Sequence, residues 1–342
     1  MSPSPRAPDP ARLSELLERF SGVTVLVLAD LVQDEFRYGE SSRISREAPV
    51  LILNHRRTDL LPGGGANAVA NLKALGARPV TVGRLGDDVS GEALLSTFAR
   101  RGIATSLIWS HESYHTPTKT RILAGGAHSV KQQVVRIDQG EPVALTASEE
   151  DLLLKNLKAG AAGAAGLLVS DYGYGLVHPG NVTPILSLAR GLRLPVVVDS
   201  RSQISIFRGV AAAAPNLEEA EKATGIAVGN DTGALERAGW RLKEMIEAEA
   251  VMVTLGSRGL ALFAEASAAI HIPVFGTDEV ADVTGAGDTV AAAFTLARLS
   301  GGSFLEAATL ANIAAGLVVL KRGTATVSPD EMRRAMAGLP RP

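Results

Sequence analysis

Two aspartates and two glycines stand close together late in the chain, in the stretch DVTGAGDTV at residues 282–290. Gly285 and Gly287 place no side chain beside the backbone amides where a helix is expected to begin, and uncovered amides at a helix start bind anions. A carboxylate beside a bound phosphate is repelled by it, so Asp288 is better explained as a general base that takes a proton from an attacking hydroxyl. The alternative is an ordinary turn in which an Asp offsets the helix dipole.

A second glycine-rich stretch, PGGGANAVANL at residues 62–72, precedes another expected helix. Amides beside glycine and the side-chain amide of Asn67 supply both donors and acceptors, as the hydroxyl groups of a polyol require. A glycine-rich turn before a helix is also common where no ligand binds.

Two further stretches are suited to a nucleotide and its metal ion. The stretch PNLEEAEKATG at residues 215–225 places Asn216 and Glu219 on one side of a first helical turn. This pair is suited either to hold waters around Mg²⁺ or to cap the helix. The TLGSRG stretch at residues 254–259 is consistent with a hairpin turn and with a platform of small residues beneath a nucleotide.

The motifs of several other protein classes are missing from the sequence, which has no Cys, no G-x-G-x-x-G after the first expected strand and no Gly-Lys pair. Disulfides and thiolate catalysis are excluded, and the dinucleotide fingerprint and the Walker-type loop are absent. A net charge of -2 gives no basic surface for nucleic acid or an anionic membrane. No apolar run reaches the roughly 18 residues of a membrane span, and the N-terminus lacks the apolar core of a signal peptide. We therefore expect a cytoplasmic protein with no nucleic-acid or membrane partner.

Apolar strands alternate with helices along most of the chain, which is typical of an α/β fold with a mostly parallel central sheet flanked by helices. The expected strands occupy residues 23–30, 79–86, 166–171, 195–200 and 250–256. The expected helices occupy residues 66–76, 179–191, 216–224 and 232–248. Ligands of such sheets bind beyond the carboxyl ends of the strands. The polar or small residues expected there, each also a common turn former, are Asp30, Asp34, Asp171, Asp199, Thr254 and Gly256.

The chain is expected to contain one main domain. Residues 1–20 should form a Pro-rich leader and a short helix, and residues 21–340 the α/β domain. Two regions, about 35–60 and 105–138, contain short extended segments such as PVLIL, TSLIW and TKTRIL with few helical patterns between them. We expect these segments to form a small separate β-sheet that covers a cleft as a lid; an antiparallel extension of the main sheet is the alternative.

The motifs together give the chain a family resemblance. The stretches GGGAN, PNLEE, TLGSRG and DVTGAGDTV, in this order, resemble the ribokinase-like (PfkB) carbohydrate kinases over residues 20–330. Within that family the chain is most similar to the D-glycero-β-D-manno-heptose 7-phosphate kinases, through SRISREAPV, TKTRI, QQVVRID and SDYGYG. Those kinases often carry a C-terminal adenylyltransferase domain, for which a chain of 342 residues has no room, so we expect a kinase-only form. The resemblance implies a ribokinase-like fold with a β-sheet lid, and phosphate transfer from ATP to the anomeric 1-hydroxyl of the heptose phosphate.

The resemblance also implies roles for individual residues. Asp288 would be the catalytic base, with the amides of Gly285, Ala286 and Gly287 as an anion hole. The residues implied for the sugar are Asp30, Asp34, Gly64, Gly65, Asn67, Arg121 and Arg201. The residues implied for ATP are Asn216, Glu219, Thr254, Gly256, Gly259 and Asn312, with Glu219 also holding Mg²⁺ through water. A monovalent cation near residues 278–283 and 318–323, as in some relatives, and a homodimer formed through the lid are further implications.

Two positions depart from the pattern of the heptose kinases. Tyr174 stands in SDYGYG where Lys is usual, and DSRS at residues 199–202 replaces DPKG, so Arg201 takes the place of a second lysine. Arg still binds phosphate, whereas Tyr supplies no charge. The other cations available for a sugar phosphate are Arg43, Lys119, Arg121 and Arg136. The departures leave two alternatives open: a kinase of the same family for another sugar, sugar phosphate or nucleoside, and a catalytically silent sugar-binding module. The missing fingerprint loop disfavours a dinucleotide-dependent oxidoreductase.

Overall fold

The computed structural model describes residues 8–126, 129–264, 268–276 and 281–338, so most of the predicted leader lies outside the described residues. Helix α1 (Pro10–Glu18) opens the described chain. The Asp9 side chain accepts the amide of Ala11 at 2.9 Å, and a proline at the first helical position has no amide to leave unpaired. One side of α1 is buried, which confirms the predicted short helix, through Leu13, Leu16 and Leu17.

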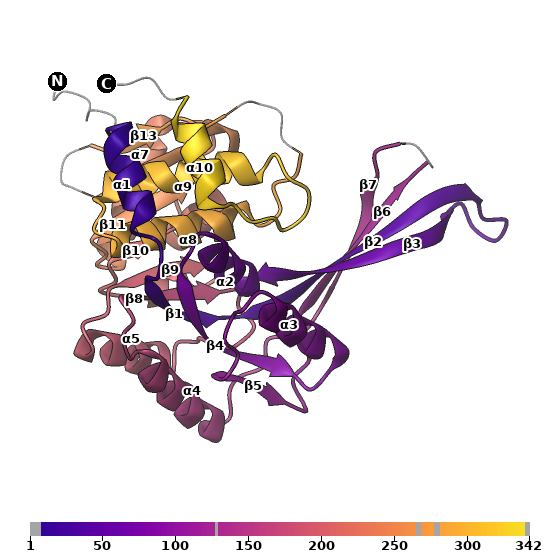
Figure 1. Cartoon of the computed structure of the whole chain (residues 1–342), viewed down its shortest axis with the longest axis horizontal. Helices are drawn as coiled ribbons and strands as arrows, with labels where there is room; N and C mark the ends of the chain where they lie inside the picture. Colours follow the sequence, from indigo (N-terminus) through magenta and orange to yellow (C-terminus); the bar gives the residue numbers. More distant parts are fainter. Residues whose placement is uncertain (1–7, 127–128, 265–267, 277–280, 339–342) are drawn as a thin grey trace.

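Among the described residues, nine strands form the central sheet, in the order β13-β12-β11-β10-β9-β8-β1-β4-β5 (Figure 1). They are β1 (Thr24–Ala29), β4 (Arg78–Gly86), β5 (Ile108–His111), β8 (Gly166–Asp171), β9 (Val196–Ser200), β10 (Ala212–Ala213), β11 (Ala250–Thr254), β12 (Leu260–Phe263) and β13 (Ile270–Ile272). Neighbouring strands from β5 to β11 are parallel, and β12 and β13 add an antiparallel edge. Parallel neighbours need crossover connections, so the carboxyl ends of these strands meet along one edge.

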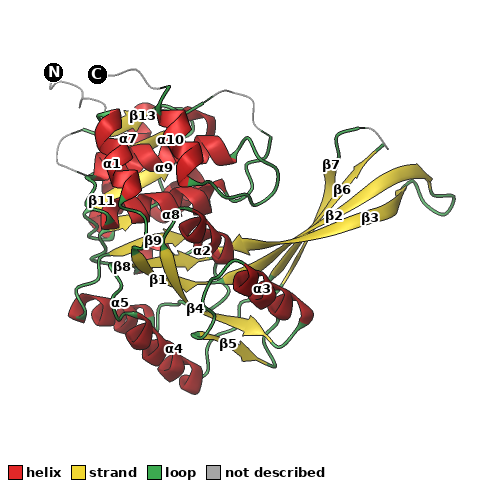
Figure 2. Cartoon of the chain, in the orientation of Figure 1, coloured by secondary structure: helices red, strands yellow, loops and turns green. Residues whose placement is uncertain are grey.

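Helices cover both faces of the central sheet (Figure 2). They are α2 (Gly65–Ala74), α3 (Val89–Arg100), α4 (Ala147–Gly160), α5 (Val182–Gly191), α6 (Leu217–Thr224), α7 (Thr232–Met245), α8 (Ala286–Leu299), α9 (Phe304–Val318) and α10 (Pro329–Met336). Along β1, Val25 and Val27 belong to one buried cluster with α1, α2, α8 and α9, whereas Leu26 and Leu28 belong to a second cluster with α4, α5 and α7. Successive side chains of a strand point to opposite faces, so one apolar strand supplies both cores. None of the helices in the described part of the chain is long and apolar enough to cross a membrane.

Four strands form a second, smaller sheet that projects from the body (Figure 1). It has the order β3-β2-β6-β7, with β2 (Leu31–Ile44), β3 (Leu51–Gly64), β6 (Thr118–Gly125) and β7 (Gln132–Gln139). The strand β2 pairs antiparallel with β3 and parallel with β6. The predicted α/β fold, with a mostly parallel central sheet and a small separate β-sheet, is confirmed.

One segment predicted for the small sheet lies elsewhere. The strand β5 begins at Ile108, within the TSLIW motif, and ends at His111. It pairs in parallel with β4 at the edge of the central sheet, with Gly83 opposite Ile108. Helix α3 connects these two strands, so they form a β-α-β unit whose crossover returns the chain to the same sheet. A short apolar strand pairs equally well with either sheet, and the preceding helix decides which one is within reach.

Gly239 in α7 is predicted to be needed for packing against the central sheet. A Cβ at this position would lie 2.2 Å from the ring of Phe263, which is fully buried and is also packed edge-on against Trp240. We expect Gly239→Ala to lower the free energy of unfolding by about 1–3 kcal/mol, because the ring has no space into which to move. Urea unfolding followed by circular dichroism measures the change.

The matched control is Gly191→Ala at the end of α5, where no heavy atom lies within 4 Å of the new Cβ. This variant should unfold within about 1 kcal/mol of the wild type or be slightly more stable. Equal stability of the two variants would show that α7 does not pack on Phe263 as described.

Candidate active site

Helix α8 begins after a position that only glycine can occupy. Gly285 is the N-cap residue and has a φ of 79°, in the left-handed region that residues with a Cβ rarely adopt. A Cβ there would also lie 2.4 Å from Nδ2 of Asn67. Just upstream, the carboxylate of Asp282 accepts the amides of Thr284 and Gly323, both at 2.9 Å, and so ties the loop to the chain that follows α9.

The first turn of α8 has the properties of an anion site, with one correction to the prediction. The first amides of a helix have no acceptor within the helix, and they lie at its positive end. At Gly287 no heavy atom lies within 4 Å of the place a Cβ would take, so a ligand can approach the backbone. The amide of Ala286, however, already donates to the carbonyl of Val283 at 3.2 Å and is not a free donor. An anion would therefore rely on the neighbouring amides of the turn.

Asp288 lies in this first turn and its carboxylate is buried, with the residue only 1% exposed. Its Oδ2 accepts a hydrogen bond from Nδ2 of Asn67 at 2.9 Å, and its Oδ1 accepts one from the hydroxyl of Tyr172. Burial raises the pKa of Asp288 to about 6, while the hydrogen bonds from Tyr172 and Asn67 and the charge of Arg201 limit the rise. At neutral pH the carboxylate is therefore ionised and basic enough to accept a proton.

Asn67 was predicted to contact a sugar, but its side-chain amide is directed to the α8 helix start. Its Nδ2 also lies 3.3 Å from the carbonyl of Gly285, and its Oδ1 accepts a hydrogen bond from Nδ2 of Asn71 at 3.1 Å. The hydroxyl of Thr289 donates to Oδ1 of Asn71 at 3.1 Å, which closes a buried network between α2 and α8. Asn67 therefore holds Asp288 in place, a role that the sequence motif did not suggest.

Three other residues that were predicted to bind the sugar make hydrogen bonds or packing contacts within the protein. Oδ2 of Asp30 accepts the amides of Tyr172 and Tyr174 at 2.8 and 3.1 Å, and burial, followed by the charge of the neighbouring Asp171, raises the pKa of Asp30 to about 7. The amide of Gly65 donates to the carbonyl of Asp30 at 3.1 Å. Gly64 is paired with β2, and a Cβ there would meet Val32 at 2.7 Å. These residues shape the turn beneath the site rather than offering free groups to a ligand.

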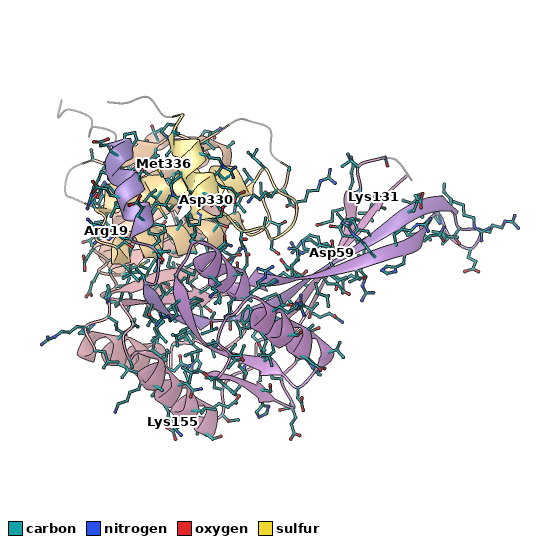
Figure 3. All side chains as sticks on the ribbon, viewed as in Figure 1. Arg19, Asp59, Lys131, Lys155, Asp330 and Met336 are labelled. Carbon is teal, nitrogen blue, oxygen red and sulfur yellow. The ribbon has the colours of Figure 1, made fainter. Side chains whose placement is uncertain are left out.

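Asp34 and Arg121, also predicted for the sugar, form a buried ion pair on the small sheet. Oδ1 of Asp34 lies 2.9 Å from Nη1 of Arg121, and their side chains are 3% and 9% exposed. Residues paired across the sheet share a face, so Lys119 and Arg136 lie on the same face as this pair. Figure 3 shows Asp59, another residue of that face, on the part of the sheet that leaves the body.

The face of the small sheet that carries the Asp34 and Arg121 pair is directed toward the start of α8. Nζ of Lys119 lies 5.0 Å from the centre of the Tyr172 ring, whose hydroxyl bonds Asp288. Burial and the nearby charge of Arg201 lower the pKa of Lys119. The small sheet therefore brings a cation to the tyrosine ring whose hydroxyl bonds Asp288.

Arg201 was predicted to bind the remote phosphate of a sugar, and the structure places it next to Asp288 instead. Its Nη2 donates to the hydroxyl of Tyr172 at 3.0 Å, and its guanidinium carbon lies 4.6 Å from the centre of that ring. Its Nε lies 4.0 Å from Oε1 of Glu219. Sequence reasoning missed Tyr172, although its position directly after the buried strand β8 was a usable signal.

Asn216 and Glu219 form a helix cap, the second of the two interpretations that their spacing allowed. The amide of Glu219 donates to Oδ1 of Asn216, and the amide of Asn216 donates to Oε2 of Glu219, both at 2.8 Å. Oε1 of Glu219 stays outside this cap. Asp199 is buried nearby, and its pKa is raised to about 8 by burial and by the charges of Asp288 and Glu219. The described residues contain no group of three or more His, Cys, Asp or Glu side chains arranged to hold a metal ion.

The remaining residues predicted for a nucleotide line one cavity of about 370 Å³. Its predicted members are Thr254, Gly256, Gly259 and Asn312, and the α8 helix start supplies Ala286 and Gly287. Most of the other lining side chains are apolar, including Val274 and Val290. TLGSRG forms the turn between the antiparallel strands β11 and β12, the first interpretation that the sequence allowed, and it is also part of the wall of this cavity. An apolar cavity of this size that opens onto a helix N-terminus suits a flat ring system attached to an anionic group.

Comparison with known proteins identifies relatives. A family model described as pfkB family carbohydrate kinase matches residues 26–331. The chain is 39% identical over 330 residues to the bifunctional protein HldE of Pelobacter propionicus, covering 96% of this chain and 66% of the relative. It is 36% identical over 333 residues to the bifunctional protein HldE of Mesorhizobium japonicum, covering 96% and 65%. The chain thus spans just under two thirds of the length of these relatives.

Solved structures of low sequence identity share the fold. The ribokinase of Arabidopsis thaliana complexed with ribose and ATP superposes with a TM-score of 0.71 at 20% identity, covering 92% of this chain and 99% of that one. Phosphofructokinase-2 of Escherichia coli in complex with fructose-6-phosphate gives a TM-score of 0.71 at 19% identity, covering 93% and 98%. The fold predicted from the motifs is confirmed by these structures.

The buried pair of Asp34 and Arg121 generates a prediction about stability. Arg121→Met should lower the free energy of unfolding by about 3–5 kcal/mol, because it leaves a buried carboxylate without its cation. Burial already raises the pKa of Asp34, and loss of Arg121 raises it further, so the loss of stability should be larger at pH 8 than at pH 5, because the unpaired carboxyl group takes up a proton more readily as the pH falls. Thermal and urea unfolding at both pH values measure the effect.

The control is Arg136→Met, the cross-strand neighbour of Arg121, which is half exposed and pairs with the exposed Asp138. It should change the unfolding free energy by less than about 1 kcal/mol at either pH. A similar loss in both variants would mean that burial of the Asp34 pair has no special energetic role.

Proposed function

Because the chain belongs to the pfkB family of carbohydrate kinases, we propose that it transfers the γ-phosphate of ATP to the anomeric 1-hydroxyl of D-glycero-β-D-manno-heptose 7-phosphate, giving the 1,7-bisphosphate. The observation that carries the proposal is Asp288, a buried carboxylate with a pKa of about 6 at a helix N-terminus that opens into a nucleotide-sized cavity. The choice of acceptor rests on the heptose-kinase motifs of the sequence and on the HldE relatives.

In the proposed reaction the sugar hydroxyl gives its proton to Asp288. The sugar oxygen forms a bond to the γ-phosphorus, the bond from that phosphorus to the β–γ bridging oxygen breaks, and ADP leaves. Phosphoryl transfer needs placement of the reactants and stabilisation of charge on the transferred group. The free amides of the first α8 turn and the guanidinium of Arg201 are the groups placed to supply that stabilisation.

The cavity that includes Thr254, Gly256, Gly259 and Asn312 is proposed to hold the nucleoside part of ATP, with the phosphates directed toward Gly287. The residues fit a Mg²⁺ ion, because Oε1 of Glu219 is an oxygen outside the helix cap and the carboxyl groups of Asp199 and Asp288 lie close enough to interact with it or with each other through their charges. Glu219 would hold the ion through water, and the ion would neutralise charge on the phosphates.

The sugar is proposed to bind between the helix start and the small sheet, which would act as a lid. Among the residues predicted to bind the sugar, Asp34 is still proposed to do so. Positive charge for the remote phosphate is offered by Lys119, Arg121 and Arg136. Arg201 lies on the same Tyr172 ring as Lys119, so its predicted contact with a sugar phosphate stays a proposal beside its place near Asp288. A different acceptor is the second candidate, favoured by Tyr174, which stands where heptose kinases usually carry Lys.

The monovalent cation, the cytoplasmic location and the absence of a nucleic-acid partner stay predictions. A monovalent cation near residues 278–283 and 318–323 falls partly on residues 278–280, which lie outside the described chain. In the described part, the Asp282 side chain ties the two segments together through Gly323. Cytoplasmic location and independence from nucleic acid are proposed on the same footing.

We also propose that a second copy of the chain covers the outer face of the lid. Cross-strand pairing puts Leu60 and Ile137 on the face opposite Asp34 and Arg121, and Val135 follows two residues from Ile137 on that face. These three side chains lie on the two edge strands of the small sheet, β3 and β7, and are 40%, 48% and 48% exposed, a large share of water contact for apolar residues on one face of a sheet. A homodimer that packs two such faces together would remove this surface from water.

The kinase assignment is tested by measuring ADP release from Mg²⁺-ATP with a panel of acceptors: heptose 7-phosphate, fructose phosphates, ribose, unphosphorylated heptose and adenosine. We expect turnover mainly with heptose 7-phosphate, and a loss of at least about 10³-fold in kcat for Asp288→Asn with ATP binding retained. In the wild type kcat/KM should fall below pH 6 as Asp288 takes up a proton, since burial raises the pKa of that group to about 6.

Each outcome separates the candidates. Preference for another acceptor would keep the kinase and change its substrate. Activity retained by Asp288→Asn would remove Asp288 as the base, and absence of turnover with every acceptor would leave the silent sugar-binding module.

The dimer is tested by placing charge on the outer face of the lid. Val135→Asp combined with Ile137→Asp should shift the sedimentation coefficient from that of a dimer to that of a monomer, because burying two carboxylates in the interface is unfavourable. The control is Val89→Asp, an apolar-to-acid change at an 81% exposed position at the start of α3 in the body, where an acid suits the helix dipole. A wild-type chain that sediments as a monomer, or a dimer unaffected by the double change, would contradict the proposal.

A further inference from the structure

Tyr172 occupies a position between the catalytic candidate and two cations. The residue follows β8, and its hydroxyl donates to Oδ1 of Asp288 while accepting a hydrogen bond from Nη2 of Arg201 at 3.0 Å. The other carboxylate oxygen of Asp288 accepts from Asn67 at 2.9 Å. Each oxygen of Asp288 therefore has one protein donor, and the two donors come from different elements of the fold.

The ring of Tyr172, like its hydroxyl, has contacts with charged side chains of two elements. The guanidinium carbon of Arg201 lies 4.6 Å and Nζ of Lys119 lies 5.0 Å from the ring centre, so a cation from the body and one from the small sheet both contact it. Cations stack favourably on aromatic faces. The amide of Tyr172 donates to the buried carboxylate of Asp30 at 2.8 Å, which fixes the backbone at the same residue.

A carboxylate without hydrogen-bond partners rotates about the bond to its Cβ. A catalytic base must meet the sugar hydroxyl in one orientation, so this rotation lowers the rate of the reaction. We infer that Tyr172 is a positioning residue for Asp288: its hydroxyl, oriented by Arg201, holds the carboxylate in the single orientation in which one lone pair faces the acceptor. This inference rests on the proposed role of Asp288 as the base. It assigns to Tyr172 a function that no motif in the sequence gave it.

The charged groups around Asp288 determine how the hydroxyl can be tested. Arg201 from the chain after β9 and the hydroxyl of Tyr172 favour the ionised form, whereas Asp34 from β2 disfavours it. Asp199 at the end of β9 adds further negative charge, since its own pKa is raised by Asp288. Removing the hydroxyl alone therefore removes one stabilising hydrogen bond and leaves every surrounding charge in place.

The decisive variant is Tyr172→Phe, which retains the ring and its two cation contacts. We expect kcat to fall roughly 10- to 100-fold, the KM values for sugar and ATP to change less than about threefold, and the acid limb of kcat/KM to move to higher pH. An independent readout is the titration of Asp288 by ¹³C NMR with aspartate labelled at the carboxyl carbon, its signal identified by its absence in Asp288→Asn. That titration should also move to higher pH in Tyr172→Phe.

Tyr114→Phe is the matched control. Tyr114 is also buried and stacked on a guanidinium, that of Arg84 at 3.9 Å, but it has no contact with Asp288. It should leave the titration of Asp288 and the acid limb where they are in the wild type. If Tyr172→Phe does not fold, as judged by circular dichroism, Arg201→Lys replaces it: this change keeps the positive charge near Asp288 but removes the planar donor that orients the Tyr172 hydroxyl, so a smaller upward shift is expected.

The outcomes distinguish this inference from the kinase assignment. Turnover by the wild type with an unchanged Asp288 titration in Tyr172→Phe overturns the positioning role and leaves the kinase intact. Absence of turnover with every acceptor overturns the kinase, and the NMR titration then still decides whether Tyr172 controls Asp288. A shifted titration with reduced kcat supports both.

Discussion

The carboxylate of Asp288 is removed from water, and the hydrogen bonds that stabilise it there come from elements far apart in the chain. Asn67 reaches it from α2 and Tyr172 from the turn after β8, with Arg201 behind the tyrosine. A buried charge without such partners would be neutral at pH 7. The relative positions of α2, α8 and β8 are therefore constrained by the need to keep one side chain ionised.

The topology of the sheet meets that constraint. Parallel strands joined by helical crossovers bring their carboxyl ends to one edge, where the turns after β1, β8 and β9 meet the start of α8. Gly285 allows α8 to begin against Asn67 without a side chain between them. The strands and helices thus bring these side chains to one edge of the sheet, and the turns between them set the orientation of each side chain.

The charges near the α8 helix start are unbalanced, and this imbalance suits a phosphate. Burial raises the pKa of both Asp199 and Asp288, and nearby negative charge adds to the rise, from Asp288 and Glu219 at Asp199 and from Asp34 at Asp288. Lys119 and Arg201 lie close enough that each makes the other's charge less favourable. Carboxylates attract a divalent cation and the two cations attract an anion, so a metal–phosphate ligand would relieve repulsion on both sides at once.

Much of the fold and part of the site could be predicted from the sequence. Alternating apolar strands and helices follow from periodicity, because the burial of each residue is set by its near neighbours. The meeting of Thr254, Gly256, Gly259 and Asn312 in one cavity was also predicted, through their resemblance to a known set of motifs. At the glycine-rich stretch near residue 64 the structure shows a packing role, because a Cβ at Gly64 or Gly65 would meet a neighbouring segment, and the predicted sugar contact stays a prediction.

The sequence by itself determined the main strands and several of the helices of the α/β domain, that a helix begins at the glycine of DVTGAGDTV, and that an aspartate stands in its first turn. Helices α3, α4, α9 and α10 were not among the predicted elements. Tertiary structure alone decided that β5 joins the central sheet, that Asn67 hydrogen-bonds Asp288, and that Tyr172 meets a carboxylate 116 residues away. Local hydrogen bonds and periodicity are encoded by neighbouring residues. A contact between distant residues depends on the path of every crossover between them, and no short stretch of sequence contains that path.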